Sequence, residues 1–469
     1  MGEYALAIDL GASGGRHILG RMANGRIELT EVYRFQNEMI VRDGLQCWDR
    51  DALFDQVLTG MQACADRGMI PTTVGIDTWG VDYTLIDTAG SPCGPSVAYR
   101  DARTAAMPAL LDARITPADL YARTGIARQP YNTVYQLMAE QRAAKGGMPQ
   151  DARLLFTPCY LSYCLTGIAR NEHSIASTSG LLNAHTHRWD DEVLKAAGIA
   201  GGVLGDPPVQ PATVLGPLLP RVARRVGYPC TVVLPASHDT ASAYLAAPLS
   251  QQGAAVLSSG TWSLLGVERN SPILTEAARC AGFTNEGGIG GSTTFVRNII
   301  GLWLLQAIRR EWNKRLTYAE MSALALTGQD YPHTFDALQE RFLSPASMTG
   351  EIASALAEAN LPLPNSDAQL LYCVHHSLAI CYRDAITQLR ALTRSPIQAL
   401  NIVGGGSQNA TLNQLTANAT GLPVYAGPVE ATALGNLAAQ WIATNELSDL
   451  AEARDMIARS SQLAVCQPK

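Results

Sequence analysis

The N-terminal segment carries short apolar runs separated by small and polar residues. Tyr4 to Leu10 is a nearly continuous apolar run, which is typical of a buried strand. A glycine-rich loop follows and leads to a second predicted strand at Arg16 to Met22. Asn24-Gly25 is a two-residue hairpin signal, so the pattern predicts a third, antiparallel strand at Arg26 to Phe35.

The glycine loop from Gly11 to Gly15 therefore joins two antiparallel strands. Walker and Rossmann motifs place their glycines before a helix; the chain lacks GxxxxGK[ST], and no GxGxxG opens a helix after a strand. The absence of both motifs argues against a Walker-type nucleotide hydrolase and against a Rossmann dehydrogenase. Such a loop turns backbone amides toward an anion, and Asp9 is placed to face Mg²⁺ through water. An ordinary glycine turn remains the alternative.

The same pattern recurs later in the chain. Ala254 to Ser258 is again a short apolar run, followed by the turn Ser259-Gly260-Thr261 and a strand-like stretch from Trp262 to Val267. We infer two related halves, each opening with a hairpin that faces phosphate. The chain of 469 residues allows two or three domains of about 150 residues. We expect two, residues 1–246 and 247–469, meeting near Leu245 to Gly253, where polar residues interrupt the apolar pattern.

The C-terminal half alternates helical and strand patterns. Asn298 to Trp312 and Ala368 to Leu392 have apolar residues at helical spacing, and Ala399 to Val403 is a short strand that ends in three glycines. Ser407 is expected to cap the next helix, with Gly421 ending it. This order of elements predicts an α/β fold.

Composition narrows the functional class. Hydrophobic residues make up 47% and charged residues 16% of the chain, which favours a globular protein over a disordered one. No apolar stretch approaches the roughly 18 residues of a membrane span, and the first residues do not resemble a secretory signal. We therefore expect a cytoplasmic protein with no membrane partner. A formal charge of -6 disfavours a nucleic-acid partner, and ten cysteines without a CxxC pair favour reduced, buried thiols.

Two polar clusters suggest chemistry on a small molecule. In Gly75 to Asp82, Trp79 beside Gly80 offers an apolar face and open backbone for a sugar ring, although most tryptophans are simply core. In Ser237-His238-Asp239-Thr240, Asp239 is expected to act as general base toward an alcohol. Phosphoryl transfer needs an in-line hydroxyl, a base and neutralised phosphate charge.

Other polar residues give weaker signals. A His-Asp pair also suggests a metal site, but no second cluster at ligand spacing supports one, and we interpret His185 and His187 as solvated. Asn298 and Gln306 are eight residues apart, which on the predicted helix is about 12 Å along the axis. That span is comparable with the separation of a sugar and a nucleotide.

The motifs together resemble a known family. In chain order, IDLGASGGR, GIDTWGVD, YRDART, ASHDTASA, LSSGTWSLLG, RNIIGLWLLQ, NIVGGGSQN and GPVEATALGN are similar to the carbohydrate kinases of the FGGY family. The resemblance runs from about Ala5 to Leu447. It implies the two-domain actin and hexokinase (ribonuclease H-like) fold, with ATP and sugar bound in the cleft between the domains.

The resemblance also implies roles for individual residues. ATP is expected at Ala12, Ser13, Gly14, Gly15, Arg16, Thr261, Gln306 and Gly405, and the sugar at Gly80, His238, Asp239, Thr240 and Asn298. Asp239 is the expected proton acceptor, and Asp9 the expected metal residue. The first loop has Gly14 where the family more often has a serine, which removes one phosphate hydrogen bond.

The implied reaction is ATP-dependent phosphorylation of the 1-hydroxyl of L-rhamnulose in L-rhamnose catabolism, with Mg²⁺. A kinase for another deoxyketose such as L-fuculose is an alternative within the same class. A sensor that binds sugar and nucleotide without catalysis, or an actin-like assembly protein of the same fold, is an alternative outside it. The sequence makes no prediction of oligomeric state.

Overall fold

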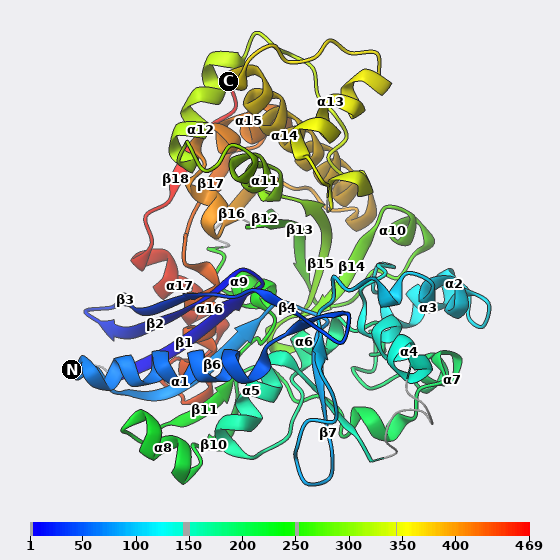
Figure 1. The fold of residues 1–469 in the computed structure, drawn as a ribbon. Coiled ribbons are helices and arrows are strands. Elements are labelled where there is room, and N and C mark those ends of the chain that lie inside the picture. The colour runs from blue at the N-terminus through cyan, green and yellow to red at the C-terminus, as the bar shows by residue number, and fades with distance from the viewer. Residues whose placement is uncertain (1–2, 144–150, 249–252, 344) are drawn as a thin grey trace. The chain divides into compact units, whose positions relative to one another are not determined.

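The computed structural model describes residues 3–143, 151–248, 253–343 and 345–469 (Figure 1). The chain alternates strands and helices, which confirms the predicted α/β class. It divides into two compact units. Unit 1 comprises Met1–Ala246, Glu268–Phe295 and Thr432–Ser460, and unit 2 comprises Ala247–Val267, Val296–Ala431 and Ser461–Lys469.

These units differ from the predicted contiguous domains by two segments. Glu268–Phe295 belongs to unit 1, where the backbone N–H of Asn285 donates to the carbonyl of Gly125 at 2.8 Å. Thr432–Ser460 also belongs to unit 1, because it carries most of a helix that packs on the first sheet. Part of the expected boundary at Leu245 to Gly253, residues 249–252, lies outside the described residues.

Unit 1 is built on a six-stranded sheet in the order β10-β11-β6-β1-β2-β3. Its strands are β10 (Thr213–Pro217), β11 (Thr231–Leu234), β6 (Pro71–Thr78), β1 (Tyr4–Gly11), β2 (Gly14–Ala23) and β3 (Arg26–Gln36). The three antiparallel strands β1, β2 and β3 confirm the predicted hairpins, whereas β6 runs parallel to β1.

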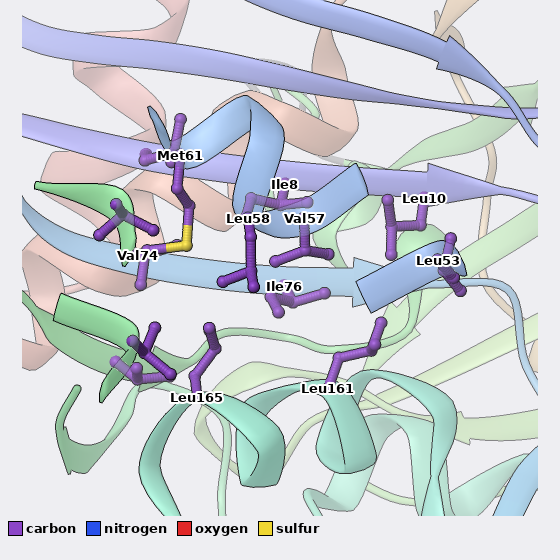
Figure 2. Packing of buried hydrophobic residues seen from close by; sticks show 14 of the residues in the cluster. Ile8, Leu10, Leu53, Val57, Leu58, Met61, Val74, Ile76, Leu161 and Leu165 are labelled. Carbon is purple, nitrogen blue, oxygen red and sulfur yellow. The ribbon is translucent and has the colours of Figure 1, made fainter. Parts of the chain in front are cut away.

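Alternate residues of β1 and β6 face a hydrophobic core (Figure 2). Two helices, α1 (Arg50–Asp66) and α5 (Thr157–Thr166), complete this core. Its labelled members are Ile8, Leu10, Leu53, Val57, Leu58, Met61, Val74, Ile76, Leu161 and Leu165. Full burial of each such side chain contributes roughly 1.5–3 kcal/mol. The intervening residues of the same strands, Asp9 among them, therefore project from the opposite face of the sheet.

The opposite face is covered by α9 (Asp239–Leu245) and α16 (Ala431–Ala443). Gln440 of α16 donates its side-chain amide to the carbonyl of Leu6 at 3.0 Å. A Cβ on Gly435 would overlap the carbonyl of Ser242, so only glycine allows α16 this close to α9. The sheet face from which Asp9 projects is thus held in place by α9 and α16.

The remaining elements of unit 1 surround this sheet. Its helices are α2 (Met107–Asp112), α3 (Pro117–Thr124), α4 (Thr133–Ala143), α6 (His173–Ser177), α7 (Asp191–Ala197), α8 (Pro220–Val226), α10 (Glu276–Cys280) and α17 (Leu450–Ser460). Its other strands are β4 (Met39–Arg42), β5 (Leu45–Trp48), β7 (Tyr83–Ile86), β8 (Ser96–Val97), β9 (Arg153–Phe156) and β14 (Phe283–Gly287).

Unit 2 repeats the topology of the first sheet. Its strands follow the order β15-β13-β12-β16-β17-β18 in the second sheet, and β12 is antiparallel to β13 and parallel to β16, as β1 is to β2 and β6. The bounds are β12 (Ala254–Ser259), β13 (Trp262–Arg269), β15 (Thr293–Ile300), β16 (Ala399–Val403), β17 (Val424–Ala426) and β18 (Ala464–Cys466). The predicted internal repeat is therefore confirmed at the level of strand order.

The helices of unit 2 are α11 (Trp303–Glu311), α12 (Tyr318–Ala325), α13 (Met348–Glu358), α14 (Asp367–Thr393) and α15 (Ala410–Thr420). The long helix predicted at Ala368 to Leu392 is confirmed as α14. The helix predicted from Asn298 is wrong over residues 298–302, because β15 continues through Ile300 and α11 begins only at Trp303. Gly301 separates them, and a Cβ there would lie 2.5 Å from the Ser263 hydroxyl.

Two smaller expectations concern α15. Ser407 does not cap this helix, because its hydroxyl donates to the carbonyl of Gly404 within a short 3-10 turn. Asn409 caps α15 instead by accepting from the backbone N–H of Leu412. Gly421 ends the helix with φ +66°, as predicted.

The ten cysteines are all unpaired, and six of them are buried. This agrees with the prediction of reduced thiols, although Cys93 and Cys280 are exposed. Within the described part of the chain, none of the helices has the length and apolar character needed to cross a membrane.

Candidate active site

Three ionisable residues meet on one face of the unit 1 sheet. Strand register places Asp9 of β1 opposite Arg16 of β2 on one side and opposite Asp77 of β6 on the other. Residues opposite one another on neighbouring strands project to the same face. The Arg16 Nη2 donates to Asp9 Oδ2 at 2.6 Å, so the predicted phosphate-binding arginine is paired with the predicted metal residue.

Asp77 is a completely buried carboxyl group. The side-chain amide of Asn436 donates to its Oδ2 at 2.5 Å and also to the carbonyl of Gly75 at 3.2 Å. The other oxygen, Oδ1, has no hydrogen-bond partner among the described residues. Burial, and then the nearby charge of Asp9, raise the pKa of Asp77 well above its usual value, which favours its protonated form.

The loop after β11 presents the second set of residues. His238 precedes α9, and Asp239 and Thr240 begin it. The Thr240 hydroxyl donates to Asp239 Oδ1 at 3.1 Å, and His238 Nε2 lies 3.4 Å from the same oxygen. Burial raises the pKa of Asp239, while the neighbouring His238 opposes that rise. The Asp239 side chain keeps 34% exposure, so a ligand can reach it.

Two glutamates that the sequence analysis missed support this loop. Glu172 precedes α6 and accepts from the backbone N–H groups of Ser174 and Ser237 at 2.6 and 3.1 Å. The Ser174 hydroxyl donates to Glu172 and accepts from the backbone N–H of His238. Glu286 of β14 places its Oε2 at 3.2 Å from His238 Nδ1. A single glutamate outside any recognised motif gave no signal for such a role.

Gly80 lies directly beside His238. A Cβ at Gly80 would lie 3.4 Å from His238 Nε2 and 3.2 Å from the Thr178 hydroxyl oxygen. The next residue, Val81, has φ +68° and donates its backbone N–H to that hydroxyl at 3.1 Å. The predicted substrate residues Gly80, His238, Asp239 and Thr240 are thus grouped in unit 1.

Trp79 does not offer an open face for a sugar ring. Its side chain is buried against Trp48, with the two ring centroids 4.4 Å apart. The indole N–H groups of Trp79 and Trp48 both donate to Asp82 Oδ2, at 2.9 and 2.6 Å. Burial raises the pKa of Asp82, although these donors and Gln136 oppose the rise. Trp79 is therefore a core residue that fixes the segment containing Gly80.

The first glycine loop is a tight turn with Ala12 and Ser13 between β1 and β2. A Cβ on Gly14 would lie 2.7 Å from the carbonyl of Phe35, and one on Gly15 would overlap the ring of Phe35. Packing against β3 thus demands glycine at both positions, independently of any ligand. Ser13 is exposed at the tip of the turn.

Unit 2 carries the remaining predicted residues. Thr261 lies in the turn between β12 and β13, and its hydroxyl is 3.4 Å from both side-chain atoms Oε1 and Nε2 of Gln306 on α11. Asn298 lies on β15, so its predicted separation from Gln306 along one helix is wrong. Its buried Oδ1 has no partner among the described residues.

Gly405 occupies the turn that follows β16. Nothing lies within 4 Å of a Cβ built on Gly405, whereas one on Gly406 would overlap the hydroxyl of Ser259. Gly404 has φ +83°, which favours glycine. Of these three glycines, Gly405 is the one with open space beside it.

Family models match both halves of the chain. Residues 4–246 match the N-terminal domain and residues 255–444 the C-terminal domain of the FGGY family of carbohydrate kinases. The chain belongs to the FGGY family of carbohydrate kinases. It is therefore a carbohydrate kinase, and the resemblance found in the motifs is confirmed. Such a kinase takes its phosphoryl group from ATP.

FGGY relatives are similar over nearly the whole chain. The rhamnulokinase of Oceanobacillus iheyensis is 39% identical over 464 residues, which cover 99% of this chain and 98% of the relative. The rhamnulokinase of Bacillus subtilis is 39% identical over 464 residues, covering 99% of this chain and 95% of the relative.

Crystal structures of other kinases share the fold. A xylulose kinase from Lactobacillus acidophilus superimposes with a TM-score of 0.82 at 18% identity, covering 100% of this chain and 94% of the other. A glycerol kinase from Plasmodium falciparum gives a TM-score of 0.80 at 15% identity, with the same coverage. The sugar kinase fold expected from the motifs is confirmed.

His187 departs from its predicted solvated state. Its Nδ1 lies 2.8 Å from Nε2 of His173, and burial lowers the pKa of both rings, that of His173 to about 4. His185 is exposed, as predicted. In the described ranges no three His, Cys, Asp or Glu side chains are grouped so as to hold a metal ion.

Proposed function

We propose that this kinase transfers the γ-phosphoryl group of ATP to the 1-hydroxyl of L-rhamnulose, giving L-rhamnulose 1-phosphate and ADP in L-rhamnose catabolism. The observation that carries the proposal is Asp239 at the partly exposed start of α9, between His238 and Thr240 and beside Gly80. Relatives named rhamnulokinase that are 39% identical over nearly the full chain support the choice of sugar.

Asp239 is the proposed proton acceptor. Its carboxylate takes the proton of the 1-hydroxyl as the sugar oxygen forms a bond to the γ-phosphorus. The bond from the γ-phosphorus to the bridging oxygen breaks, and its electron pair leaves with ADP. Thr240 holds Oδ1 of Asp239 at 3.1 Å, so the carboxylate has a fixed orientation before substrate arrives.

Sugar recognition is assigned mainly to unit 1. We infer that Gly80 gives the sugar close access to the backbone, because any side chain there would fill the space in front of His238. His238 and Thr240 supply polar groups to the sugar hydroxyls. Asn298 is proposed as a further sugar ligand from unit 2, and its unpartnered Oδ1 supports this role.

ATP is assigned to turns in both units. The backbone from Ala12 to Gly15 and the side chain of Arg16 are proposed to hold the phosphates. Thr261 is proposed for the transferring phosphate, Gln306 for the nucleotide and Gly405 for the adenosine part. The Thr261 hydroxyl contacts the Gln306 side chain, which supports a shared ligand for these two residues.

The residues around Asp9 fit a magnesium ion. Asp9 supplies a hard carboxylate oxygen, the type of ligand that Mg²⁺ prefers, and the neighbouring Oδ1 of Asp77 has no hydrogen-bond partner among the described residues. We propose that Asp9 holds Mg²⁺ through water. When bound, the ion neutralises phosphate charge during transfer.

A panel of ketoses with coupled detection of ADP tests the substrate. We expect L-rhamnulose to give the highest kcat/KM among L-rhamnulose, L-fuculose, L-xylulose, D-xylulose and glycerol, with a phosphate ester at O1 detected by ³¹P NMR. A preference for L-fuculose would replace the proposed substrate within the same reaction. If none of these compounds leads to formation of ADP, the proposal is contradicted.

A further inference from the structure

The side chains of Glu286, His238 and Asp239 in unit 1 form a row of three neighbouring ionisable groups. The imidazole of His238 lies between two carboxyl groups, with Nδ1 at 3.2 Å from Glu286 Oε2 and Nε2 at 3.4 Å from Asp239 Oδ1. The side chains of His238 and Glu286 are each only 8% exposed, whereas Asp239 opens to solvent. The row therefore runs from a buried glutamate to the proposed base.

Hydrogen bonds fix the backbone on both sides of Glu286 in β14. The backbone N–H of Asn285 donates to the carbonyl of Gly125 at 2.8 Å, and that of Gly287 donates to the Ser177 hydroxyl at 2.7 Å. The amide of Asn285 makes further bonds to the carbonyls of Gly125 and Ile273. Since both residues beside it are fixed, Glu286 approaches His238 without the freedom of a surface side chain.

The charges that face this row come from several elements. His238 is faced by Glu286 on β14, by Asp239 on α9 and by Glu172 at the start of α6. The charge of Asp9 on β1 also raises the pKa of Asp239, and the charge of Asp239 in turn raises the pKa of the buried Asp77 on β6. His173 of α6 lies against Gly287, next to Glu286. Among the side chains named here, only His238 is a basic group that lies close to both Glu286 and Asp239.

We propose that Glu286 is a positioning residue, whose carboxylate forms an ion pair with His238 on the Nδ1 side of the ring, so that the cationic Nε2–H faces Asp239 and the sugar. This inference rests on the proposed function, since it concerns how the base of that reaction is kept ready. We assign Glu286 no contact with either substrate. It acts through His238.

The pKa directions agree with this geometry. Burial by itself lowers the pKa of His238, but Glu286, followed by Asp239 and Glu172, raises it above the ordinary value. Burial raises the pKa of Asp239, and the His238 cation opposes that rise. Asp239 accepts a proton only when it is ionised. Loss of the Glu286 charge should therefore discharge His238 and leave Asp239 protonated to a higher pH.

The first test compares kcat–pH profiles of the full-length protein and three variants. Glu286→Gln keeps the shape of the side chain and removes its charge. The acidic limb of the kcat–pH profile of Glu286→Gln should move to higher pH by about 1 to 3 pH units, because a close opposite charge shifts a pKa by this amount. Glu286→Asp keeps the negative charge, so the acidic limb of its profile should lie at the same pH as in the wild type. Glu276→Gln, on the exposed surface of α10, removes the same charge elsewhere and should change nothing.

A second measurement does not depend on turnover. Histidine labelled with ¹³C and ¹⁵N reports the charge of each ring by NMR, and His238→Gln identifies the signal of His238. The ring should remain protonated above pH 6.5 in wild-type protein and lose its proton at a lower pH in Glu286→Gln.

These readouts separate the possible failures. An unchanged His238 titration in a folded Glu286→Gln protein would overturn the inference. Equal losses of kcat in the Gln and Asp variants without a shifted limb would show a merely structural role and would also overturn it. If no ketose is phosphorylated, the proposed function fails, but the titration still decides whether Glu286 charges His238.

Discussion

Asn436 of α16 donates its side-chain amide to Oδ2 of Asp77, across 359 positions of sequence, at 2.5 Å. The same amide nitrogen reaches the carbonyl of Gly75, and Gln440 donates to Asn436 Oδ1 at 2.7 Å. This buried polar network joins a late helix to the strand beside Asp9. It explains why Thr432–Ser460 belongs to unit 1.

Asn436→Ala should lower the stability of unit 1. It leaves Oδ2 of Asp77 without its donor, and a buried unpaired polar group costs about 1 to 3 kcal/mol. Urea unfolding followed by circular dichroism measures the change. Asn418→Ala, on the exposed face of α15, is the matched control and should unfold like the parent. Equal midpoints for the two variants would argue against the network.

Gly435→Ala should reduce both stability and turnover. The new Cβ overlaps the carbonyl of Ser242, and overpacking of this kind costs about 1 to 3 kcal/mol. Relief requires α9 to move, and α9 carries Asp239. Gly202→Ala, whose Cβ meets nothing within 4 Å, should leave thermal unfolding and kcat near the parent values. A fully active Gly435→Ala protein would show that α9 tolerates displacement.

Trp48→Phe should affect sugar binding more than the chemical step. It removes one of the two indole donors to Asp82, the carboxylate that also holds Trp79 and hence the Gly80 segment. Hydrogen bonds to charged groups contribute roughly 1.5–3 kcal/mol. We expect a higher KM for the ketose with a smaller change in kcat. Trp189→Phe, which loses a bond to the carbonyl of Asp206, is the control. A lowered kcat at unchanged KM would contradict this view of Asp82.

His375 of α14 should make the protein sensitive to acid. Burial lowers its pKa from 6.5 to about 4, and its ring bonds the carbonyl of Leu371 and the amide of Asn409. Between these pH values the unfolded chain binds the extra proton, so this contribution to stability is complete above pH 6.5 and is lost as pH falls toward 4.

Urea unfolding between pH 4 and 7 tests the contribution of His375. The variant His375→Gln should reduce the slope of unfolding free energy against pH by up to about 1.4 kcal/mol per unit. His185→Gln, at an exposed site, should keep the parent slope. An unchanged slope in His375→Gln would show that this ring titrates alike in both states.

Local patterns predicted much of the fold. The apolar runs and Asn24-Gly25 identify β1, β2 and β3, and the weak repeat identifies β12 and β13. Residues close in sequence, such as His238, Asp239 and Thr240, also stay together in the site. The helix expected at Asn298 was wrong because an apolar stretch fits a buried strand as well as a helix, and sheet pairing decided the outcome.

The supporting residues of the site could not be found in this way. The roles of three of them depend on contacts with residues that are distant in sequence, namely those of Asp77, Glu172 and Glu286. One signal was present for Asn436 and Gln440, which are polar residues four apart on a mostly apolar helix. Such a pair predicts a buried polar contact but not the strand that receives it.

Asp239→Asn gives the most direct measurement, because Asp239 is the proposed acceptor of the proton of the 1-hydroxyl. With L-rhamnulose and ATP at saturation, kcat should fall by roughly 10² to 10⁴, while the Kd for ATP stays near the parent value. Asp191→Asn, at an exposed position on α7, should keep full activity. A kcat in Asp239→Asn equal to that of the parent would remove Asp239 from the reaction and contradict the account.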